Sequence, residues 1–269
     1  MTNGINHKAR KRFGQNFLHD EQVIQQIVAA IAPNDKQTLV EIGPGQGAIT
    51  RLLIEDCKEL HVIEIDRDLV QYLQSRFSHH PHFHIHSVDA LRFNLCDLAQ
   101  EGKLRLVGNL PYNISTPLIF HVLDDIQCIE DMHFMLQKEV VERMAASPGC
   151  KEYGRLSIMT QYYCVVEPVF DVRPESFKPA PKVDSSIVRL TPHLVKPVEV
   201  DDFRCFSQLV TQAFTMRRKT LRNAMKNMLS EDQIKSCEVD PTLRPDTIDI
   251  AAYARLSNLK FAIDSEQQE

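Results

Sequence analysis

Residues 38–48 read TLVEIGPGQGA, an apolar run followed by three glycines at alternate positions. The apolar run has the length and composition of a buried strand. The glycines allow a tight turn and let the backbone approach a ligand closely, and the segment from Ala48 to Glu55 has helical spacing. This order of strand, glycine loop and helix predicts a ligand site where the strand ends.

The segments around this loop alternate between strand and helix patterns. Apolar residues from Val23 to Ile31 are at helical spacing, and Asp20 before them is a typical N-cap. Such alternation predicts an α/β fold, with a mostly parallel central sheet and helices on both faces. Further strands are expected over 59–66, 82–90, 103–109 and 131–137, and further helices over 69–77 and 114–123.

The pattern changes near Pro192, where residues 192–200 resemble a linker. Before it, YYCVVEPVFDV and SSIVRL predict two late strands, joined by the proline-rich PESFKPAPKVDS. We therefore expect two domains, residues 1–195 around the sheet and residues 196–269 as a small all-helical C-terminal domain. The apolar residues that define the first helix of that second domain are Phe203, Phe206, Leu209, Val210, Ala213 and Phe214.

The composition is that of an ordinary globular protein. Of 269 residues, 43% are hydrophobic and 25% are charged, and the net charge of −5 excludes a uniformly basic coat for nucleic acid.

The seven cysteines show no CxxC spacing, so we expect reduced thiols, with neither a disulfide framework nor a cysteine zinc site. The absence of a signal-peptide core and of a membrane-length apolar run predicts a soluble, cytoplasmic protein. We also expect a monomer.

Two kinds of ligand are compatible with the glycine loop. GPGQGA fits the relaxed fingerprint of a dinucleotide site, and Glu64 follows at about the distance of a ribose-binding acid. Glu41 and Asp89, however, are expected at the same edge of the sheet. Like charges about 4 Å apart cost on the order of 4 kcal/mol at an effective dielectric of about 20, which disfavours a pyrophosphate there. S-adenosylmethionine carries a sulfonium cation and no phosphate, so it fits an acid-lined pocket better.

Within that pocket the acids have separate tasks. Glu64, at the end of the second strand, is expected to accept hydrogen bonds from both ribose hydroxyls. Asp89 is placed to accept from the adenine amino group, while Ala90 and Leu91 pack against the ring. Each acid alone is equally typical of a helix cap or a solvated carboxylate, but their positions at the ends of successive strands favour a cofactor pocket.

The fourth strand ends in Asn109-Leu110-Pro111-Tyr112. An adenine N6 amino group is a poor nucleophile, because its lone pair is delocalised into the ring. Two acceptors aimed at its hydrogens, the Asn109 side-chain oxygen and the Leu110 carbonyl, favour a more tetrahedral nitrogen, and Pro111 keeps Leu110 extended. Tyr112 is expected to stack on the base. The motif predicts methyl transfer to adenine by positioning and electrostatic stabilisation, without a metal ion or a base of shifted pKa.

The chain resembles the small-subunit (16S) ribosomal RNA adenine dimethyltransferase family nearly from end to end. The resemblance implies a Rossmann-like class I methyltransferase fold. It also implies transfer of four methyl groups from S-adenosylmethionine to two adjacent adenosines in a hairpin loop near the 3′ end of the RNA, and a role in ribosome biogenesis. The partner implied is 16S rRNA in the small subunit or its precursor. The motifs that carry the resemblance are RFGQNFL (12–18), EIGPGQGAIT (41–50), VIEID (62–66), VDAL (88–91), GNLPYNIST (108–116) and SFKPAPKVDSSIVRL (176–190).

The resemblance further implies roles that the residues alone do not indicate. Phe177 is expected to flank the target base opposite Tyr112. The expected cofactor-binding residues are Gln15, Asn16, Leu18, Gly43, Gly45, Glu64, Asp89, Ala90 and Asn109.

Three other functions stay open on the sequence. The chain is compatible with a ribosome-assembly factor for which particle binding matters more than methylation. It is also compatible with the related large-subunit rRNA dimethylase that confers antibiotic resistance, although SFKPAPKVDSSIVRL and a basic C-terminal helix favour the small-subunit enzyme by resemblance. The third alternative, a nicotinamide-linked oxidoreductase, leaves the Asn-Leu-Pro-Tyr motif unexplained.

Two basic clusters are candidates for RNA contact. In the second cluster, positions 218, 219, 222 and 226 fall on one face of a presumed helix, which suits a phosphate backbone. The alternative for both clusters is solvated surface charge. The clusters are Lys8, Arg10, Lys11 and Arg12, and Arg217, Arg218, Lys219, Arg222 and Lys226.

The stretch HHPHFHIH places His82, His84 and His86 on one face of a presumed strand. Three imidazoles on one face could ligate zinc. Nothing nearby in the sequence completes a recognisable metal pattern, however, and methyl transfer needs no metal. We therefore expect a half-exposed strand face and no metal site.

Overall fold

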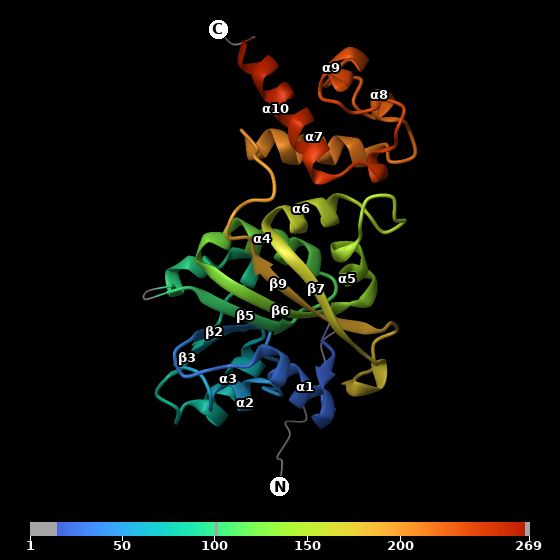
Figure 1. Ribbon diagram of the computed structural model, residues 1–269. Coiled ribbons are helices and arrows are strands. Elements are labelled where there is room, and N and C mark those ends of the chain that lie inside the picture. The colour runs from blue at the N-terminus through green and yellow to red at the C-terminus, as the bar shows by residue number, and fades with distance from the viewer. Residues whose placement is uncertain (1–14, 100–101, 267–269) are drawn as a thin grey trace. The chain divides into compact units, whose positions relative to one another are not determined.

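The computed structural model describes residues 15–99 and 102–266, which form two compact units. The first unit holds the described residues up to Val141 together with Glu167–Pro192. The second holds Glu142–Val166 together with the described residues from His193 onward. Figure 1 shows the elements of each unit. No feature of the sequence marks the internal segment 142–166 as part of the second unit.

A seven-stranded sheet is the centre of the first unit, in the order β4-β3-β2-β5-β6-β9-β7. β9 (Ser185–Pro192) pairs antiparallel with β6, and β7 (Cys164–Val172) lies beyond β9. The predicted mostly parallel α/β sheet is thereby confirmed. Its parallel part consists of β4 (Phe83–His86), β3 (Glu59–Ile63), β2 (Thr38–Ile42), β5 (Leu104–Asn109) and β6 (Ile129–Gln137).

Helices cover both faces of this sheet (Figure 1). On one face lie α1 (Glu21–Ile31), α2 (Thr50–Leu53) and α3 (Arg67–Phe77), whose apolar sides share a core with Leu39 of β2. α4 (Ser115–Asp124) lies on the other face. The buried positions of α1 and α3 recur every three or four residues, which is the pattern of a helix with one side against a core.

The strand predicted over 82–90 is shorter in the structure and ends at His86. The Asp89 carboxylate accepts a hydrogen bond from the Leu91 amide (3.1 Å) and caps a 3-10 turn over Ala90–Arg92. A local cap of this kind offers the backbone an alternative to the ladder of a sheet. Asp89 therefore lies in a turn after the strand.

Two helices, α5 (Lys138–Ala145) and α6 (Arg155–Tyr163), were not predicted from the sequence. The reason is clear for α6, because five consecutive residues of this helix, 156–160, are all buried. A helix that is buried on every side has no polar face, so its sequence lacks the 3.6-residue period by which a helix is recognised.

A short two-stranded sheet joins segments far apart in the chain. β1 (Phe17–Leu18) pairs antiparallel with β8 (Phe177–Lys178). Beside this pair, the His19 amide donates to the Ser176 carbonyl (3.0 Å), and the Ser176 hydroxyl donates to the Asp20 carboxylate (3.0 Å) that caps α1. The motifs RFGQNFL and SFKPAPKVDSSIVRL therefore meet in space.

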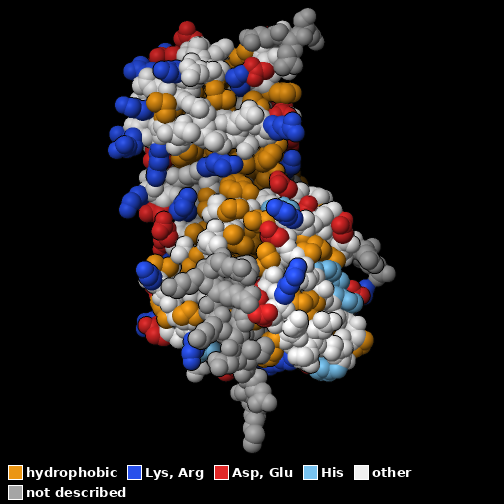
Figure 2. Space-filling model, turned by 180° about the vertical axis from the view of Figure 1, so that it is seen from behind, with side chains coloured by type: hydrophobic (Ala, Val, Ile, Leu, Met, Phe, Trp, Pro, Cys, Tyr) orange, Lys and Arg blue, Asp and Glu red, His pale blue; other side chains and the backbone are white. Residues whose placement is uncertain are grey.

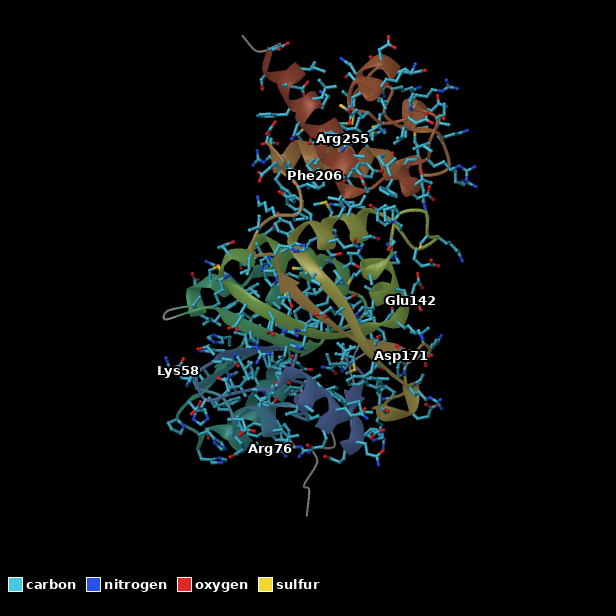
Figure 3. The ribbon with its side chains drawn as sticks, viewed as in Figure 1. Lys58, Arg76, Glu142, Asp171, Phe206 and Arg255 are labelled. Carbon is cyan, nitrogen blue, oxygen red and sulfur yellow. A yellow bond between two sulfur atoms is a disulfide. The ribbon has the colours of Figure 1, made fainter. Side chains whose placement is uncertain are left out.

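Aromatic packing holds α6 within the second unit. Tyr162, 1% exposed, stacks on Phe203 with ring centroids 5.6 Å apart and packs against Phe206 at 5.2 Å. Both phenylalanines belong to α7 (Phe203–Thr215), and Figure 3 labels Phe206 on that helix. The apolar face that the sequence predicted for this helix thus packs against an internal segment of the chain.

The rest of the second unit is helical, as predicted for the C-terminal region. It contains α8 (Leu221–Ala224), α9 (Glu231–Ser236) and α10 (Ile250–Glu266). Arg255 of α10, labelled in Figure 3, donates to the Cys237 carbonyl at the end of α9 (2.8 Å). Among the described helices of the chain, none combines the length and the apolar character needed to cross a membrane.

The basic segment 217–226 does not form the continuous helix that the sequence predicted. α7 ends at Thr215, and Thr220, in an extended conformation, is the N-cap of the short α8. The extended backbone at Thr220 interrupts the helical path, and the new helix begins at Leu221. Leu221 and Ala224 are buried and anchor this turn of helix.

Cys96 and Cys128 form a disulfide, with Cα atoms 5.5 Å apart. The expectation that all cysteines are reduced is wrong for this pair. The two residues are 32 positions apart, and only the fold brings their 3-10 turns together. The free thiols are Cys57, Cys150, Cys164, Cys205 and Cys237.

Arg105, only 5% exposed, ties α1 to the sheet. Its guanidinium donates to both carboxylate oxygens of Asp131 on β6 (2.8 and 2.9 Å). It also donates to the carbonyls of Ile31 (2.6 Å) and Ala32 (3.3 Å) at the end of α1, and to the Gln37 side chain (2.8 Å). These bonds engage all the donors of a guanidinium group, so the buried charge is fully satisfied.

Replacement of Arg105 by Met should lower the free energy of unfolding by about 3–5 kcal/mol, because the Asp131 carboxylate then stays buried without its partner. Arg189 is the matched control, since it lies 3.7 Å from the same carboxylate with its side chain 46% exposed. Arg189→Met should cost at most about 1 kcal/mol. Urea unfolding followed by circular dichroism measures both, and equal losses would contradict this account.

Candidate functional site

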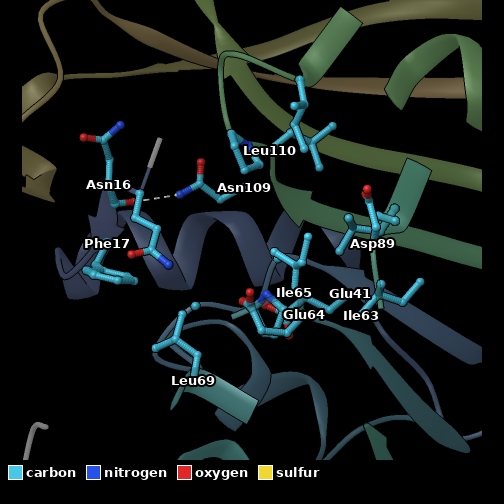
Figure 4. A pocket seen from close by; sticks show the side chains of 18 of the residues that line it. Asn16, Phe17, Glu41, Ile63, Glu64, Ile65, Leu69, Asp89, Asn109 and Leu110 are labelled. Carbon is cyan, nitrogen blue, oxygen red and sulfur yellow. Dashed lines mark hydrogen bonds between the residues drawn. The ribbon is translucent and has the colours of Figure 1, made fainter. Parts of the chain in front are cut away.

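A cavity lies at the carboxyl ends of the parallel strands. Because β2 is in register with β3 and β5, Ile42 lies beside Ile63 and Glu41 lies beside Val107. The segments that leave these three strands therefore converge, as in other open α/β sheets. Figure 4 shows the cavity, and the predicted residues that line it are Gln15, Asn16, Gly43, Gly45, Glu64, Asp89, Ala90, Asn109, Leu110, Pro111 and Tyr112.

The glycine loop packs against the N-terminal segment. At Gly45 the backbone has a φ of +58°, and a Cβ there would lie 3.2 Å from the ring of Phe17. Glycine is therefore required both for the left-handed turn and for the close approach of the aromatic ring. Phe17 itself lines the cavity. Only the resemblance indicated a role for RFGQNFL, and the structure adds Phe17, which was not predicted, to the residues that line the cavity.

Two buried carboxyl groups lie at the base of the cavity. Glu41 is 2% exposed and accepts a hydrogen bond from the Thr50 hydroxyl (2.6 Å), and burial raises its pKa to about 7. Burial also raises the pKa of Glu64, whose carboxylate accepts from the Asp66 amide (2.9 Å). Burial disfavours the charged form of both groups, so a positive charge placed in the cavity would stabilise that form.

Apolar side chains open into the cavity beside the acids. Ile65 follows Glu64 directly and is 46% exposed, and Val88 precedes Asp89 and is 39% exposed. Both line the cavity. Exposed branched side chains next to carboxylates suit a planar ring with polar edges. Sequence reasoning did not single out either residue, although the position next to each acid is a feature that could have identified them.

The Asn109 side chain is oriented by the backbone of the N-terminal segment. Its Nδ2 donates to the Asn16 carbonyl (3.1 Å), and Figure 4 shows its Oδ1 pointing away from Asn16. A carboxamide whose donor group is engaged in this way presents its oxygen as a hydrogen-bond acceptor. The contact also explains physically why Asn16 belongs to the site.

The segment after Asn109 is attached to the sheet at two points. The Leu110 amide donates to the Met135 carbonyl of β6 (3.1 Å). The hydroxyl oxygens of Tyr112 and Ser185 lie 2.6 Å apart in a hydrogen bond, and Ser185, at the start of β9, is fully buried. Burial raises the pKa of Tyr112, so the phenol stays neutral. Ser185 positions the tyrosine ring, a role that sequence reasoning missed.

Two predicted site residues do not line the cavity. Leu18 is 7% exposed and Phe177 is 3% exposed, and both belong to the hydrophobic core of the first unit. The structure therefore places both residues in the core of the first unit. A role of Leu18 in the cofactor pocket and a role of Phe177 opposite Tyr112 stay predictions. Leu18 and Phe177 are partners in the β1–β8 pair, and both side chains are buried in the core beside it.

Of the two predicted basic clusters, only the second lies within the described residues. Arg217 is paired with Asp246 (3.1 Å), and Arg222 lies 3.4 Å from Glu231. Of the predicted contacts within the described part of the chain, three are exposed and form no ion pair, namely Arg218, Lys219 and Lys226. Outside the described residues lie Lys8, Arg10, Lys11 and Arg12.

Comparison with known proteins agrees with this geometry. Residues 6–260 match the sequence model of the family described as ribosomal RNA adenine dimethylase. A ribosomal RNA small subunit methyltransferase A from Pseudomonas aeruginosa is 55% identical over 259 residues, which cover 96% of this chain and 97% of the relative. The protein of the same name from a Marinomonas species is 53% identical with the same coverage.

Solved structures show the same fold. A dimethyladenosine transferase from Plasmodium falciparum superimposes with a TM-score of 0.77 at 26% identity, covering 93% of this chain and 98% of its own. The 23S rRNA methyltransferase ErmE superimposes with a TM-score of 0.71 at 24% identity, covering 91% of this chain and 100% of its own. With a family match over nearly its whole length, the chain belongs to the ribosomal RNA adenine dimethylase family.

Proposed function

We propose that this chain transfers methyl groups from S-adenosylmethionine to N6 of two adjacent adenosines in the hairpin loop near the 3′ end of small-subunit rRNA. The observation that carries the proposal is the oriented Asn109 amide at a cavity lined by acids and apolar side chains, in a member of the rRNA adenine dimethylase family. The enzyme works as a monomer in the cytoplasm, on the small subunit or its precursor, and takes part in small-subunit biogenesis.

The cavity lining supports S-adenosylmethionine as the cofactor. When bound, it supplies a methyl group on a positively charged sulfur. Glu64 is placed to accept hydrogen bonds from the ribose hydroxyls and Asp89 from the adenine amino group, while Ile65 and Val88 offer apolar surface to the adenine ring. Glu41 and Glu64 together offset the positive charge, which a dinucleotide pyrophosphate lacks.

Asn109 and Leu110 prepare the target nitrogen for attack. Oδ1 of Asn109 and the carbonyl of Leu110 accept the two amino hydrogens of N6, which draws the lone pair out of conjugation with the ring. Bound S-adenosylmethionine would supply the methyl carbon for this lone pair, S-adenosylhomocysteine would be the leaving group, and the N6 proton would pass to solvent. The chain accelerates the step by positioning the base and by stabilising the positive charge that develops on N6.

Tyr112 holds the adenine in place for this step. Its ring lines the cavity and is fixed by the hydrogen bond to Ser185, so it offers a flat surface on which a splayed-out base can stack. A stacked base has few orientations available to it. Stacking on Tyr112 therefore keeps N6 within reach of Asn109 while the methyl group is transferred.

Small-subunit rRNA as the substrate is supported by the names of the relatives and by the basic surface. In Figure 2, Lys and Arg side chains gather along the edge of the second unit that α8 and α9 form. Arg218, Lys219 and Lys226 belong to this segment and are exposed. Such side chains bind phosphate oxygens without reading sequence, so they position the RNA while the cavity selects adenine.

The function is tested by methylation of unmethylated small subunits with a labelled methyl donor, followed by nucleoside mass spectrometry. The expected product is N6,N6-dimethyladenosine. Label in cytosine, guanine or a protein side chain would remove the proposal. Large subunits should stay unlabelled in a parallel reaction, which separates this activity from that of the related large-subunit dimethylase.

Replacement of Asn109 by Ala should lower the methylation rate at least about 100-fold, because the acceptor for the N6 hydrogens is lost. Binding of the small subunit should be unchanged, since the basic surface is intact. Filter binding and a methylation time course measure the two effects separately. Retention of the methylation rate would contradict the role of Asn109, and loss of both would show that the change had disturbed the fold.

Cofactor affinity should depend on pH through Glu41. Since the pKa of this group in the folded chain is about 7, it is mostly protonated near pH 6 and mostly ionised near pH 8. A cation binds the ionised form better, so S-adenosylmethionine should bind up to about 10-fold more tightly at about pH 8 than at about pH 6. Isothermal titration calorimetry over this range measures the effect.

Two controls accompany that titration. S-adenosylhomocysteine lacks the sulfonium charge and should show a much flatter pH profile. Glu41→Gln cannot ionise and should flatten the profile of S-adenosylmethionine itself. The same steep profile for both ligands, or for the variant, would contradict the assignment.

Charge reversal at Arg218 and Lys226 should weaken RNA binding and reduce its salt dependence, because phosphate contacts are lost with their counterion release. Cofactor affinity should not change. Lys36→Glu combined with Lys103→Glu is the matched control, since both lysines are exposed in the first unit and the change in net charge is the same. Filter binding over a salt series measures the effect, and equal loss in the control would contradict a specific basic surface.

A further inference from the structure

A cluster of metal-ligating side chains lies on β3 and β4, outside the cavity lining. β4 is an edge strand whose neighbour is β3, and their parallel register places His61 beside His84. Residues two apart on a strand share a face, so Glu59 projects on the same side as His61. One ligand atom from each of these three side chains lies within 4.8 Å of the other two.

The spacing of the first two ligands already fits a metal ion. Nε2 of His61 and Oε2 of Glu59 are 3.3 Å apart. Two ligands on bonds of about 2.0–2.1 Å to a tetrahedral zinc ion are separated by roughly 3.3 Å. The His84 ring stacks on His61 with centroids 4.7 Å apart and is half-buried on the edge strand. One of its ring nitrogens lies within 4.8 Å of both other ligand atoms, so a rotation of this side chain would bring it to the third position.

His86 supplies the support that a metal-bound imidazole needs. Its Nε2 lies 3.1 Å from Nδ1 of His61, on the ring edge opposite to Glu59. A neutral imidazole carries one N–H group, so a proton on Nδ1 directed at His86 leaves the lone pair of Nε2 facing Glu59 and His84. Metal-ligating histidines characteristically donate their second N–H to such a partner.

We propose that Glu59, His61 and His84 form a binding site for a divalent transition-metal ion, best suited to zinc. Two imidazoles and one carboxylate are ligands typical of zinc, and a water molecule completes the tetrahedron. The bound ion links the edge strand β4 to β3 through side chains, in addition to the backbone ladder.

The sequence did not reveal this site, because only the register of the two strands assembles it. The expectation of no metal site considered His82, His84 and His86 as a set on one strand. In the structure His82 instead binds the Ile54 carbonyl through Nε2 (2.8 Å), and His86 supports His61 from behind. Glu59 and His61 come from the neighbouring strand.

The test is titration of the tag-free, full-length chain with zinc chloride, followed by calorimetry and by thermal unfolding. One zinc ion per chain should bind and raise the unfolding temperature, since a ligand of the native state stabilises it. The double variant Glu59→Gln/His84→Ala changes only side chains that reach solvent and should bind zinc at least about 10-fold more weakly. His86→Ala should weaken binding by about 10- to 100-fold.

Glu55→Gln/His80→Ala is the matched control, because these two side chains form a separate pair 4.0 Å apart near the surface. This variant should bind zinc like the wild type. Cobalt(II) gives a second readout, since a tetrahedral site of nitrogen and oxygen ligands has intense visible bands without thiolate charge transfer. Absence of stoichiometric binding, or equal binding by the Glu59/His84 variant, or loss in the Glu55/His80 control, would overturn the proposal.

Discussion

The parallel register of β2 with β3 and β5 is the constraint on which the whole site depends. It brings the ends of three strands to one place, and each end contributes a different group: the glycine loop, Glu64 and Asn109. The strands approach closely there because Gly108 has no side chain, and a Cβ at this position would lie 2.5 Å from the Ile42 carbonyl oxygen. Any residue larger than glycine would push β5 away from β2 and move Asn109 with it.

The segment before α1 completes the site from outside the sheet. Asn16 orients the Asn109 amide through its carbonyl, and Phe17 rests on the glycine loop. This segment keeps its position because β1 pairs with β8 and because Asp20 is bonded to Ser176. The proline-rich motif thus acts on the site indirectly, because it positions the segment that contains Asn16, and Asn16 orients the Asn109 amide.

Much of this arrangement could be predicted from local sequence. The glycine loop, the acids at strand ends and the Asn-Leu-Pro-Tyr motif follow from spacing and from the chemistry of the residues. Contacts between distant segments could not be predicted, because no period or motif encodes them. Ser185 beside Tyr112, Cys96 beside Cys128 and the pairing of β1 with β8 all depend on which segments the fold makes neighbours.

Errors in the predicted elements have a similar origin. The basic segment had the right spacing for one long helix, but Thr220 and the burial of Leu221 divide it into turns and a short helix. Phe177 was expected in the proline-rich connection between two strands, yet it belongs to β8, which pairs with β1, and its side chain is buried. In both cases the local sequence pattern was identified correctly, but contacts with distant parts of the chain determined the structure.

The compact units are discontinuous in the chain, which constrains the order of events during synthesis. Residues 142–166 belong with a region that the ribosome makes only after β9 is complete. Tyr162 on α6 emerges well before Phe203 and Phe206, the rings that cover it in the native protein. A nascent chain thus carries a large bare aromatic surface until α7 appears, and a product that stopped near residue 195 would keep that surface permanently.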